Sequence, residues 1–192
     1  MGYNSGPGGS LDNTTAIGSG ARVGSSNHIQ LGNAAITALR CQVGLTVISD
    51  ARFKYDVRPD VPGLAFITRL RPVTYRLDAA RQDGFQRTGT LPAFIPDATA
   101  PLHTGFLAQE VEATARALGY AFDGVHAPAT ARDTYGLAYA QFVVPLVRAV
   151  QELNHQVADL KAQNTALKSQ ATAFAQRLRA LEAAGTQATA SH

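Results

Sequence analysis

The chain has 192 residues, of which 45% are hydrophobic and 16% charged, and its formal net charge at pH 7 is +3. These values fit one ordinary soluble domain with appendages, and because no apolar run is long enough we expect neither a membrane span nor a secretory signal. The single cysteine, Cys41, excludes an internal disulfide and a cysteine-based zinc cluster, while the mild basic excess indicates a mixed solvated surface rather than a nucleic-acid footprint.

Residues 1–44 are rich in Gly, Ser, Asn and Ala and contain only isolated apolar side chains. A weak repeat is visible, since Ala-Ile-Gly at 16–18 recurs fourteen residues later as Gln-Leu-Gly at 30–32. Short repeats typically form solenoid coils that turn on Gly or Asn, where a positive φ is needed. The spacing resembles the head repeats of trimeric autotransporter adhesins and phage fibre stems, in which three chains share one core. We predict a repetitive β-rich stem over 1–44, with a flexible Gly/Ser linker as the alternative.

Residues 45–138 predict a mixed α/β core. The β-branched run at 45–48 is strand-like, and Asp60 is a candidate N-cap for a helix whose apolar side chains keep helical spacing up to Leu70. The following Arg-Pro ends that helix, and residues 73–77 return to a strand pattern.

The second half of this core is expected to contain two loops and a helix. Residues 78–103 carry Pro-bounded turns and little periodicity, which predicts a long surface loop, and a further loop is expected over 120–136. Between them an apolar stripe over 111–118 predicts a helix that ends at Gly119.

The strongest periodic signal lies in the last part of the chain. Eleven apolar residues and one Asn follow one another there at alternating steps of three and four, at Val143, Leu146, Val150, Leu153, Val157, Leu160, Asn164, Leu167, Ala171, Phe174, Leu178 and Leu181. This heptad pattern predicts a coiled-coil helix over 139–184, followed by a disordered tail over 185–192. Val and Leu at alternating core positions favour two-stranded coils in model peptides, and Asn164 fixes the register of the helices. The heptad pattern alone therefore does not determine how many chains associate.

The candidate for chemistry follows the run at 45–48, where Ser49 and Lys54 stand five residues apart. A Ser/Lys pair can cleave a peptide bond when a neutral amine takes the hydroxyl proton, which requires burial of the lysine. Residues five apart face opposite sides of a strand and lie about 140° apart on a helix, so a turn at Asp50 or Ala51, or a neighbouring chain, has to join them. Without context, Ser49 and Asp50 are turn or cap residues and Lys54 is a solvated cation.

Four motifs follow one another over residues 49–160. They are Ser-Asp-Ala-Arg-Phe-Lys-Tyr-Asp-Val at 49–57, Leu-Arg-Pro-Val-Thr-Tyr at 70–75, Gly-Phe-Leu-Ala-Gln-Glu-Val at 105–111, and Tyr-Ala-Gln-Phe at 139–142 with Pro-Leu at 145–146 leading into Val-Gln-Glu-Leu at 150–153. Together they resemble the endosialidase-type intramolecular chaperone domain, the self-cleaving C-terminal serine peptidase module of phage tail spikes and tail fibres.

The resemblance implies an α+β homotrimer in which a small mixed domain precedes a long coiled-coil helix. It implies that this domain trimerises, aligns the fibre stem before it, and then releases itself by single-turnover autoproteolysis next to Ser49. Ser49 is the implied nucleophile and Lys54 the implied general base. Asp50 is a further candidate for a supporting role. Gln109 and Glu110 match the family's Ala-Gln-Glu motif, and for both the open alternative is a structural role in ending a strand and starting a helix.

The resemblance also implies partners and a location. The partners are the chain itself, as a homotrimer, and the upstream fibre stem in cis, with no nucleic acid, membrane, cofactor or metal. The five histidines (28, 103, 126, 155 and 192) are scattered, which indicates surface or core roles. The implied location is a phage or prophage tail fibre assembled in the bacterial cytoplasm, with the bacterial cell surface as the alternative. A non-cleaving structural trimerisation cap of a fibre or adhesin, and an accessory protein that binds DNA, stay open as other functions.

Overall fold

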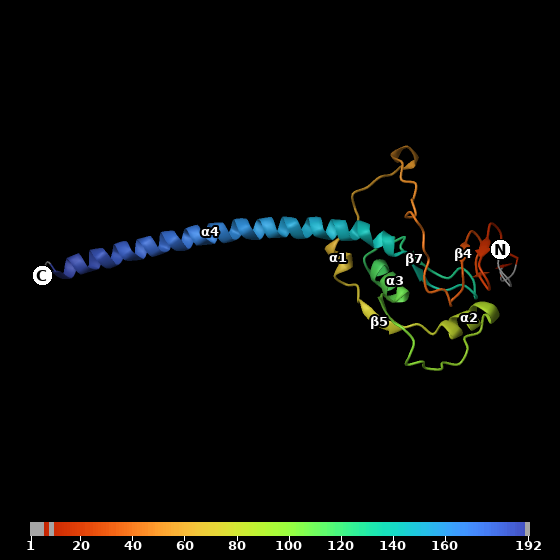
Figure 1. The fold of residues 1–192 in the computed structure, drawn as a ribbon. Coiled ribbons are helices and arrows are strands. Elements are labelled where there is room, and N and C mark those ends of the chain that lie inside the picture. Colours follow the sequence, from red (N-terminus) through yellow and green to blue (C-terminus); the bar gives the residue numbers. More distant parts are fainter. Residues whose placement is uncertain (1–5, 8–9, 191–192) are drawn as a thin grey trace.

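The computed structural model describes residues 6–7 and 10–190. A lobe of short elements stands at one end, and one helix of 48 residues, α4 (Val143–Ala190), projects from it (Figure 1). At 1.5 Å per residue this helix is about 70 Å long. The other elements are β1 (Gly6–Pro7), β2 (Thr15–Ile17), β3 (Arg22–Val23), β4 (Ile29–Leu31), η1 (Ala51–Phe53), α1 (Leu64–Ile67), β5 (Val73–Arg76), α2 (Ala79–Thr88), β6 (Leu102–Gly105), α3 (Ala108–Ala117), β7 (Val125–His126), β8 (Gly136–Leu137) and η2 (Tyr139–Phe142). Within the described ranges, no helix is both long and apolar enough to span a membrane.

Residues 10–33 form two stacked turns of chain, called here the N-terminal coils. Strands β2 and β4 pair in parallel, and Ile17 lies opposite Leu31. The same offset of fourteen residues joins two asparagines, because the Asn13 side-chain amide donates to Asn27 Oδ1 at 2.9 Å. Both asparagines have a positive φ, as expected of residues on which a coil turns. The two copies of the short repeat are therefore paired in register.

Residues 34–60, called here the open segment, contain one short element, η1. We expected a strand at 45–48, and this expectation is wrong for the described chain, which shows no strand pairing there. A strand needs a neighbour that offers N–H and C=O groups, whereas Figure 1 shows the η1 part of this segment looping out of the lobe before the chain returns to α1. The side chains of Leu45, Val47 and Ile48 are consequently 81–92% exposed.

The core lies where α1, α3 and the first turns of α4 meet. Its buried side chains are Phe66, Val111, Ala115, Phe122 and Phe142. The ring centroids of Phe66 and Phe122 are 5.0 Å apart and those of Phe122 and Phe142 are 4.9 Å apart, which is favourable spacing for aromatic contacts. Tilted and edge-on aromatic packing therefore fastens the base of the long helix to the mixed domain.

The start of α1 lies directly against α4. Gly63 is buried, and a Cβ added there would lie 2.6 Å from the backbone nitrogen of Ala149. The Leu64 N–H donates to Glu152 Oε2 at 2.8 Å. Asp60 is therefore not the N-cap that we expected: Gly63 holds that position, and a carboxylate from another helix satisfies the first free N–H of α1.

The strand expected over 73–77 is confirmed as β5, which pairs antiparallel with β6. The helix expected before Gly119 is confirmed as α3, with Val111 and Ala115 buried. Gly119 follows the helix with a φ of 63°, a conformation that favours glycine.

The long loop expected over 78–103 is wrong in its first half, which forms α2. Asp78 Oδ1 accepts a hydrogen bond from the Arg81 N–H at 2.9 Å at the start of this helix, and Gly89, with a φ of 76°, ends it. Phe85 is its one large apolar side chain, so the sequence has no apolar stripe from which this helix could be predicted. The loop expected over 120–136 likewise contains β7 and the start of β8, which pair antiparallel.

Helix α4 continues further than expected. It runs through Ala190, whereas we expected the helix to end at 184 and a disordered tail to follow over 185–192. Once a helix is formed, each further residue adds a hydrogen bond without a new nucleation cost, so an established helix extends more readily than it starts. Residues 191–192 of the expected tail lie outside the described residues. The apolar stripe of α4 is solvent-exposed in the single chain from Leu153 to Leu181.

Candidate functional site

A tight turn in the open segment brings Ser49 and Lys54 together. Asp50 caps η1, because its Oδ1 accepts a hydrogen bond from the Arg52 N–H at 2.9 Å. The Lys54 N–H closes the turn onto the Ala51 carbonyl at 3.1 Å, and the side chain folds back so that Nζ donates to Ser49 Oγ at 2.6 Å. The turn that five-residue spacing demands is therefore present within one chain.

Asp50 is held in its charged form. Hydrogen bonds from the Arg52 side chain and backbone lower the pKa of this carboxyl, and the guanidinium lies 2.6 Å from Oδ2. The carboxylate therefore faces Arg52 rather than the Ser49 hydroxyl. Its role in this geometry is to hold the turn in place. Arg52 was not singled out from the sequence, although Asp is a common turn residue because its side chain hydrogen-bonds the backbone two residues further on.

Ser49 and Lys54 are both solvent-exposed in the single chain. In this arrangement the lysine acts as a hydrogen-bond donor to the hydroxyl, whereas a base must accept its proton. Large apolar side chains flank the pair on both sides, and Ile48, Phe53 and Tyr55 are 85%, 73% and 92% exposed. The pair thus lies on an apolar strip that nothing in the described chain covers.

Gln109 and Glu110 lie elsewhere, in the first turn of α3. That helix lies apart from the open segment in Figure 1, so one chain does not bring these two side chains to the Ser49 turn. Glu110 Oε2 accepts a hydrogen bond from Arg71 Nε at 3.0 Å, and this contact lowers the pKa of the Glu110 carboxyl. The pair joins the segment between α1 and β5 to the start of α3, which is a structural arrangement.

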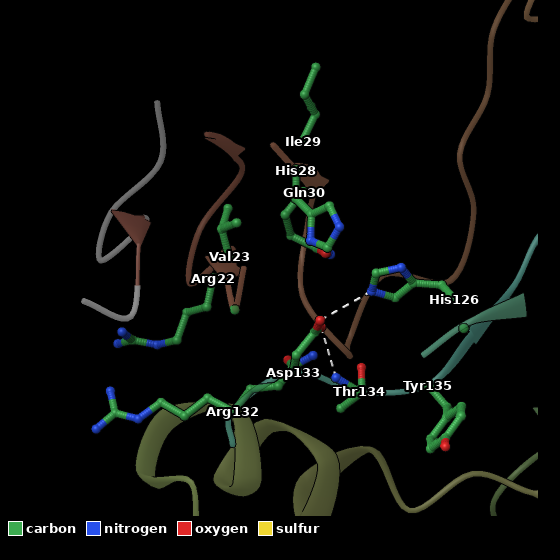
Figure 2. A pocket seen from close by; sticks show the side chains of 13 residues that line it. Arg22, Val23, His28, Ile29, Gln30, His126, Arg132, Asp133, Thr134 and Tyr135 are labelled. Atoms are coloured by element: carbon green, nitrogen blue, oxygen red, sulfur yellow. Dashed lines mark hydrogen bonds and ion pairs between the residues drawn. The ribbon is translucent and has the colours of Figure 1, made fainter. Parts of the chain in front are cut away.

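A second polar cluster, formed by Ser25, His28, His126 and Asp133, joins the N-terminal coils to the core (Figure 2). Sequence reasoning missed it and treated the histidines as scattered. Ser25 and Asp133 are 108 residues apart, so no local spacing could have signalled the contact.

Comparison with known families and proteins bears on one part of the chain. Residues 49–120 match the model of a serine-peptidase family described as chaperone of endosialidase. The match covers less than half of the chain, begins at Ser49, and includes the η1 turn, α1, the β5–β6 pair and α3. The match supports an endosialidase chaperone-type domain in this segment, as the motifs indicated. Neither the curated proteins nor the solved structures include a match to the chain.

Proposed function

We propose that this protein is an intramolecular chaperone that assembles as a homotrimer, aligns its repetitive N-terminal segment, and then cleaves itself once next to Ser49. The observation that carries the proposal is the hydrogen bond between Lys54 Nζ and Ser49 Oγ at the first residue of the matched chaperone domain. A nucleophile and its base need hydrogen-bond reach, and this pair has it.

The chemistry places the cut on one side of the serine. The Ser49 hydroxyl reaches the carbonyl carbon of Ile48 through a five-membered ring, whereas attack on its own carbonyl would need a strained four-membered ring. As the Oγ–carbonyl bond forms, the neutral amine of Lys54 takes the hydroxyl proton. The amine then returns this proton to the departing nitrogen of Ser49 as the C–N bond breaks. Water hydrolyses the resulting ester, which leaves a carboxylate on Ile48, a free amine on Ser49 and the hydroxyl restored.

Assembly supplies what the single chain lacks at this site. A lysine is a base only in its neutral form, and desolvation favours that form. The exposed apolar strip around Ser49 is the surface that neighbouring copies would cover, and covering it removes water from the reactive pair. Cleavage is thereby coupled to trimer formation, so that a chain is not cut before it is assembled.

The long helix is the proposed trimerisation element. Its stripe of exposed Val and Leu residues would otherwise leave a large apolar surface in water, and steps of three and four match a coiled-coil seam. Three chains joined there hold their N-terminal coils at high effective concentration, where exposed Ile17, Ile29 and Leu31 can meet in a shared core. Repetitive strands otherwise pair out of register with little penalty, and non-local pairing is slow.

Release completes the task. Cutting the chain between the aligned coils and the chaperone removes the contacts that nucleate assembly, so the aligned part is left kinetically trapped. The proposed location is a phage or prophage tail fibre, with a bacterial surface fibre as the alternative, and the proposed partners are the other two copies and the stem in cis.

Intact-mass measurement on freshly made protein tests the proposal. We expect the wild type to resolve into residues 1–48 and 49–192, and Ser49→Ala, Lys54→Ala and Lys54→Arg to stay whole. Ser169→Ala is the matched control, because this exposed serine lies on α4 away from the apolar stripe, and it should be cut like the wild type. A wild type that sediments as a trimer but stays uncut would overturn self-cleavage and leave the non-cleaving structural cap.

A further inference from the structure

The N-terminal coils dock onto the core through a polar pocket of about 230 Å³ (Figure 2). Ser25 Oγ donates to Asp133 Oδ2 at 2.5 Å, and Thr130 Oγ1 donates to the Gly24 carbonyl at 2.8 Å. Ser25 is buried although it is polar, so this contact is built into the interior of the junction. The pocket therefore holds two parts of the chain in a fixed relation.

Three potential metal ligands converge in this pocket. His28 comes from the turn before β4, His126 from β7, and Asp133 from the segment between β7 and β8. One nitrogen or oxygen atom from each lies within 4.8 Å of the others, and His126 Nε2 is 3.1 Å from Asp133 Oδ2. Two ligands on one tetrahedral ion are about 3.3 Å apart when the ligand–metal distances are about 2.0 Å.

We propose that His28, His126 and Asp133 bind one divalent transition-metal ion of the zinc class at this junction. Two imidazoles and one carboxylate suit zinc, nickel or copper, whereas calcium and magnesium prefer oxygen ligands alone. The ring centroids of His28 and His126 are 4.7 Å apart, and we expect the His28 side chain to rotate toward the ion when it binds. Three protein ligands leave a fourth position for water. The inference does not depend on self-cleavage, because it uses no residue of the Ser49 turn.

Hydrogen bonds hold the carboxylate in place. Ser25 Oγ and the Ala129 N–H donate to Asp133 Oδ2 at 2.5 Å and 3.1 Å, and the Thr134 N–H donates to Oδ1 at 2.9 Å. Donors that orient a ligating carboxylate in this way are the usual outer layer of a metal site.

The positive charges around the pocket lie away from the part where His28, His126 and Asp133 converge. Two arginines line the pocket, but Figure 2 shows the guanidinium groups of Arg22 and Arg132 extending away from the His126 ring. The imidazoles and the carboxylate thus occupy a separate part of the pocket. An ion held there would tie the N-terminal coils to the core and stiffen their junction.

Zinc binding to the full chain, prepared without a histidine tag, tests the site. Equilibrium dialysis with ZnCl₂ should give one ion per chain, and His28→Ala and His126→Ala should each weaken binding by roughly tenfold or more. His155→Ala is the matched control, since this histidine is exposed on α4, and it should bind like the wild type. CoCl₂ adds a spectroscopic readout, because cobalt in a four-coordinate site gives intense visible absorption that the two variants should lose.

Thermal melts in EDTA serve as the control for correct folding. In these melts the wild type and both histidine variants should have similar Tm values. Zinc should then raise the Tm of the wild type and of His155→Ala but not that of the other two. Absence of stoichiometric zinc binding, or binding that survives both His28→Ala and His126→Ala, would overturn the inference and leave the cluster as a hydrogen-bonded dock.

Discussion

The Lys54 amine lies 2.6 Å from the Ser49 hydroxyl because Asp50 closes a turn between the two residues. The contact thus depends on a carboxylate that caps the turn. Changes to that carboxylate, to the helix proposed to assemble the trimer and to the contact between α1 and α4 have separate expected results.

Asp50→Ala should slow self-cleavage without abolishing it. The substitution removes the acceptor for the Arg52 N–H and guanidinium, so the turn that presents Lys54 to Ser49 loosens. We expect a rate lower by roughly tenfold, as for a small misplacement of reacting groups. Quenched time points analysed by intact mass give the rate. Complete loss of cleavage would instead assign Asp50 a direct part in the chemistry.

Glu110→Gln separates a structural from a catalytic role. If Glu110 only pairs with Arg71, the variant should cleave within about twofold of the wild type and melt no more than a few degrees lower, since exposed ion pairs contribute little. Cleavage rate and Tm are measured on the same preparation. An uncut variant with an unchanged Tm would place Glu110 in the active site of the assembled trimer.

Leu160→Glu should prevent both assembly and cleavage. A charge in the coiled-coil seam is buried without a partner, so association should weaken by at least roughly tenfold. Ala162→Glu is the matched control, because position 162 lies about 200° around the helix from position 160 and faces away from the seam. Sedimentation reports the trimer, and intact mass reports the cut. A monomeric Leu160→Glu variant that still cleaves at the wild-type rate would uncouple the two events.

Gly63→Ala should destabilise the joint between α1 and α4. The added methyl would lie 2.6 Å from the Ala149 nitrogen and 2.8 Å from the Arg148 carbonyl carbon, and these backbone atoms cannot move aside as the end of a flexible side chain could. The expected loss is about 1–3 kcal/mol in the free energy of unfolding, as for overpacking elsewhere. Gly44→Ala has open space around the added Cβ and should change little. Urea unfolding compares the two, and equal midpoints would contradict the close approach.

Acid should weaken the contribution of Asp133. The pKa of this carboxyl falls from 3.8 to about 2 on folding, so its stabilisation is complete above about pH 5 and is lost as the pH falls through about 2. After allowance for solvent screening it amounts to about 1–2 kcal/mol. Urea unfolding in EDTA should show Asp133→Asn less stable than the wild type at pH 6, with the gap shrinking toward pH 2. A gap independent of pH would exclude this linkage.

Several features of the protein follow from the sequence because their causes are local. The heptad stripe predicts the long helix, the stripe ending at Gly119 predicts α3, and the repeat at 16–18 and 30–32 predicts the register in which β2 and β4 pair. The motif at 49–57 likewise indicates the family whose model matches from residue 49. Each signal is carried by periodicity or by adjacent residues.

Local sequence also misleads where tertiary contacts or caps decide. The β-branched run at 45–48 has strand propensity but no neighbour in the single chain, and α2 forms from its caps without an apolar stripe. The helix α1 begins at Leu64, with Gly63 as its N-cap, because Glu152, 88 residues away from Leu64, satisfies its first N–H.

The sequence by itself determined the periodic elements, the family motifs and the candidate Ser/Lys pair. Only the tertiary structure decided that Lys54 reaches Ser49 through a capped turn, that Glu110 pairs with Arg71, and that His28 meets His126 and Asp133. The physical reason is that side-chain direction at a turn and contacts between distant segments depend on the whole path of the backbone, which spacing along the chain does not encode.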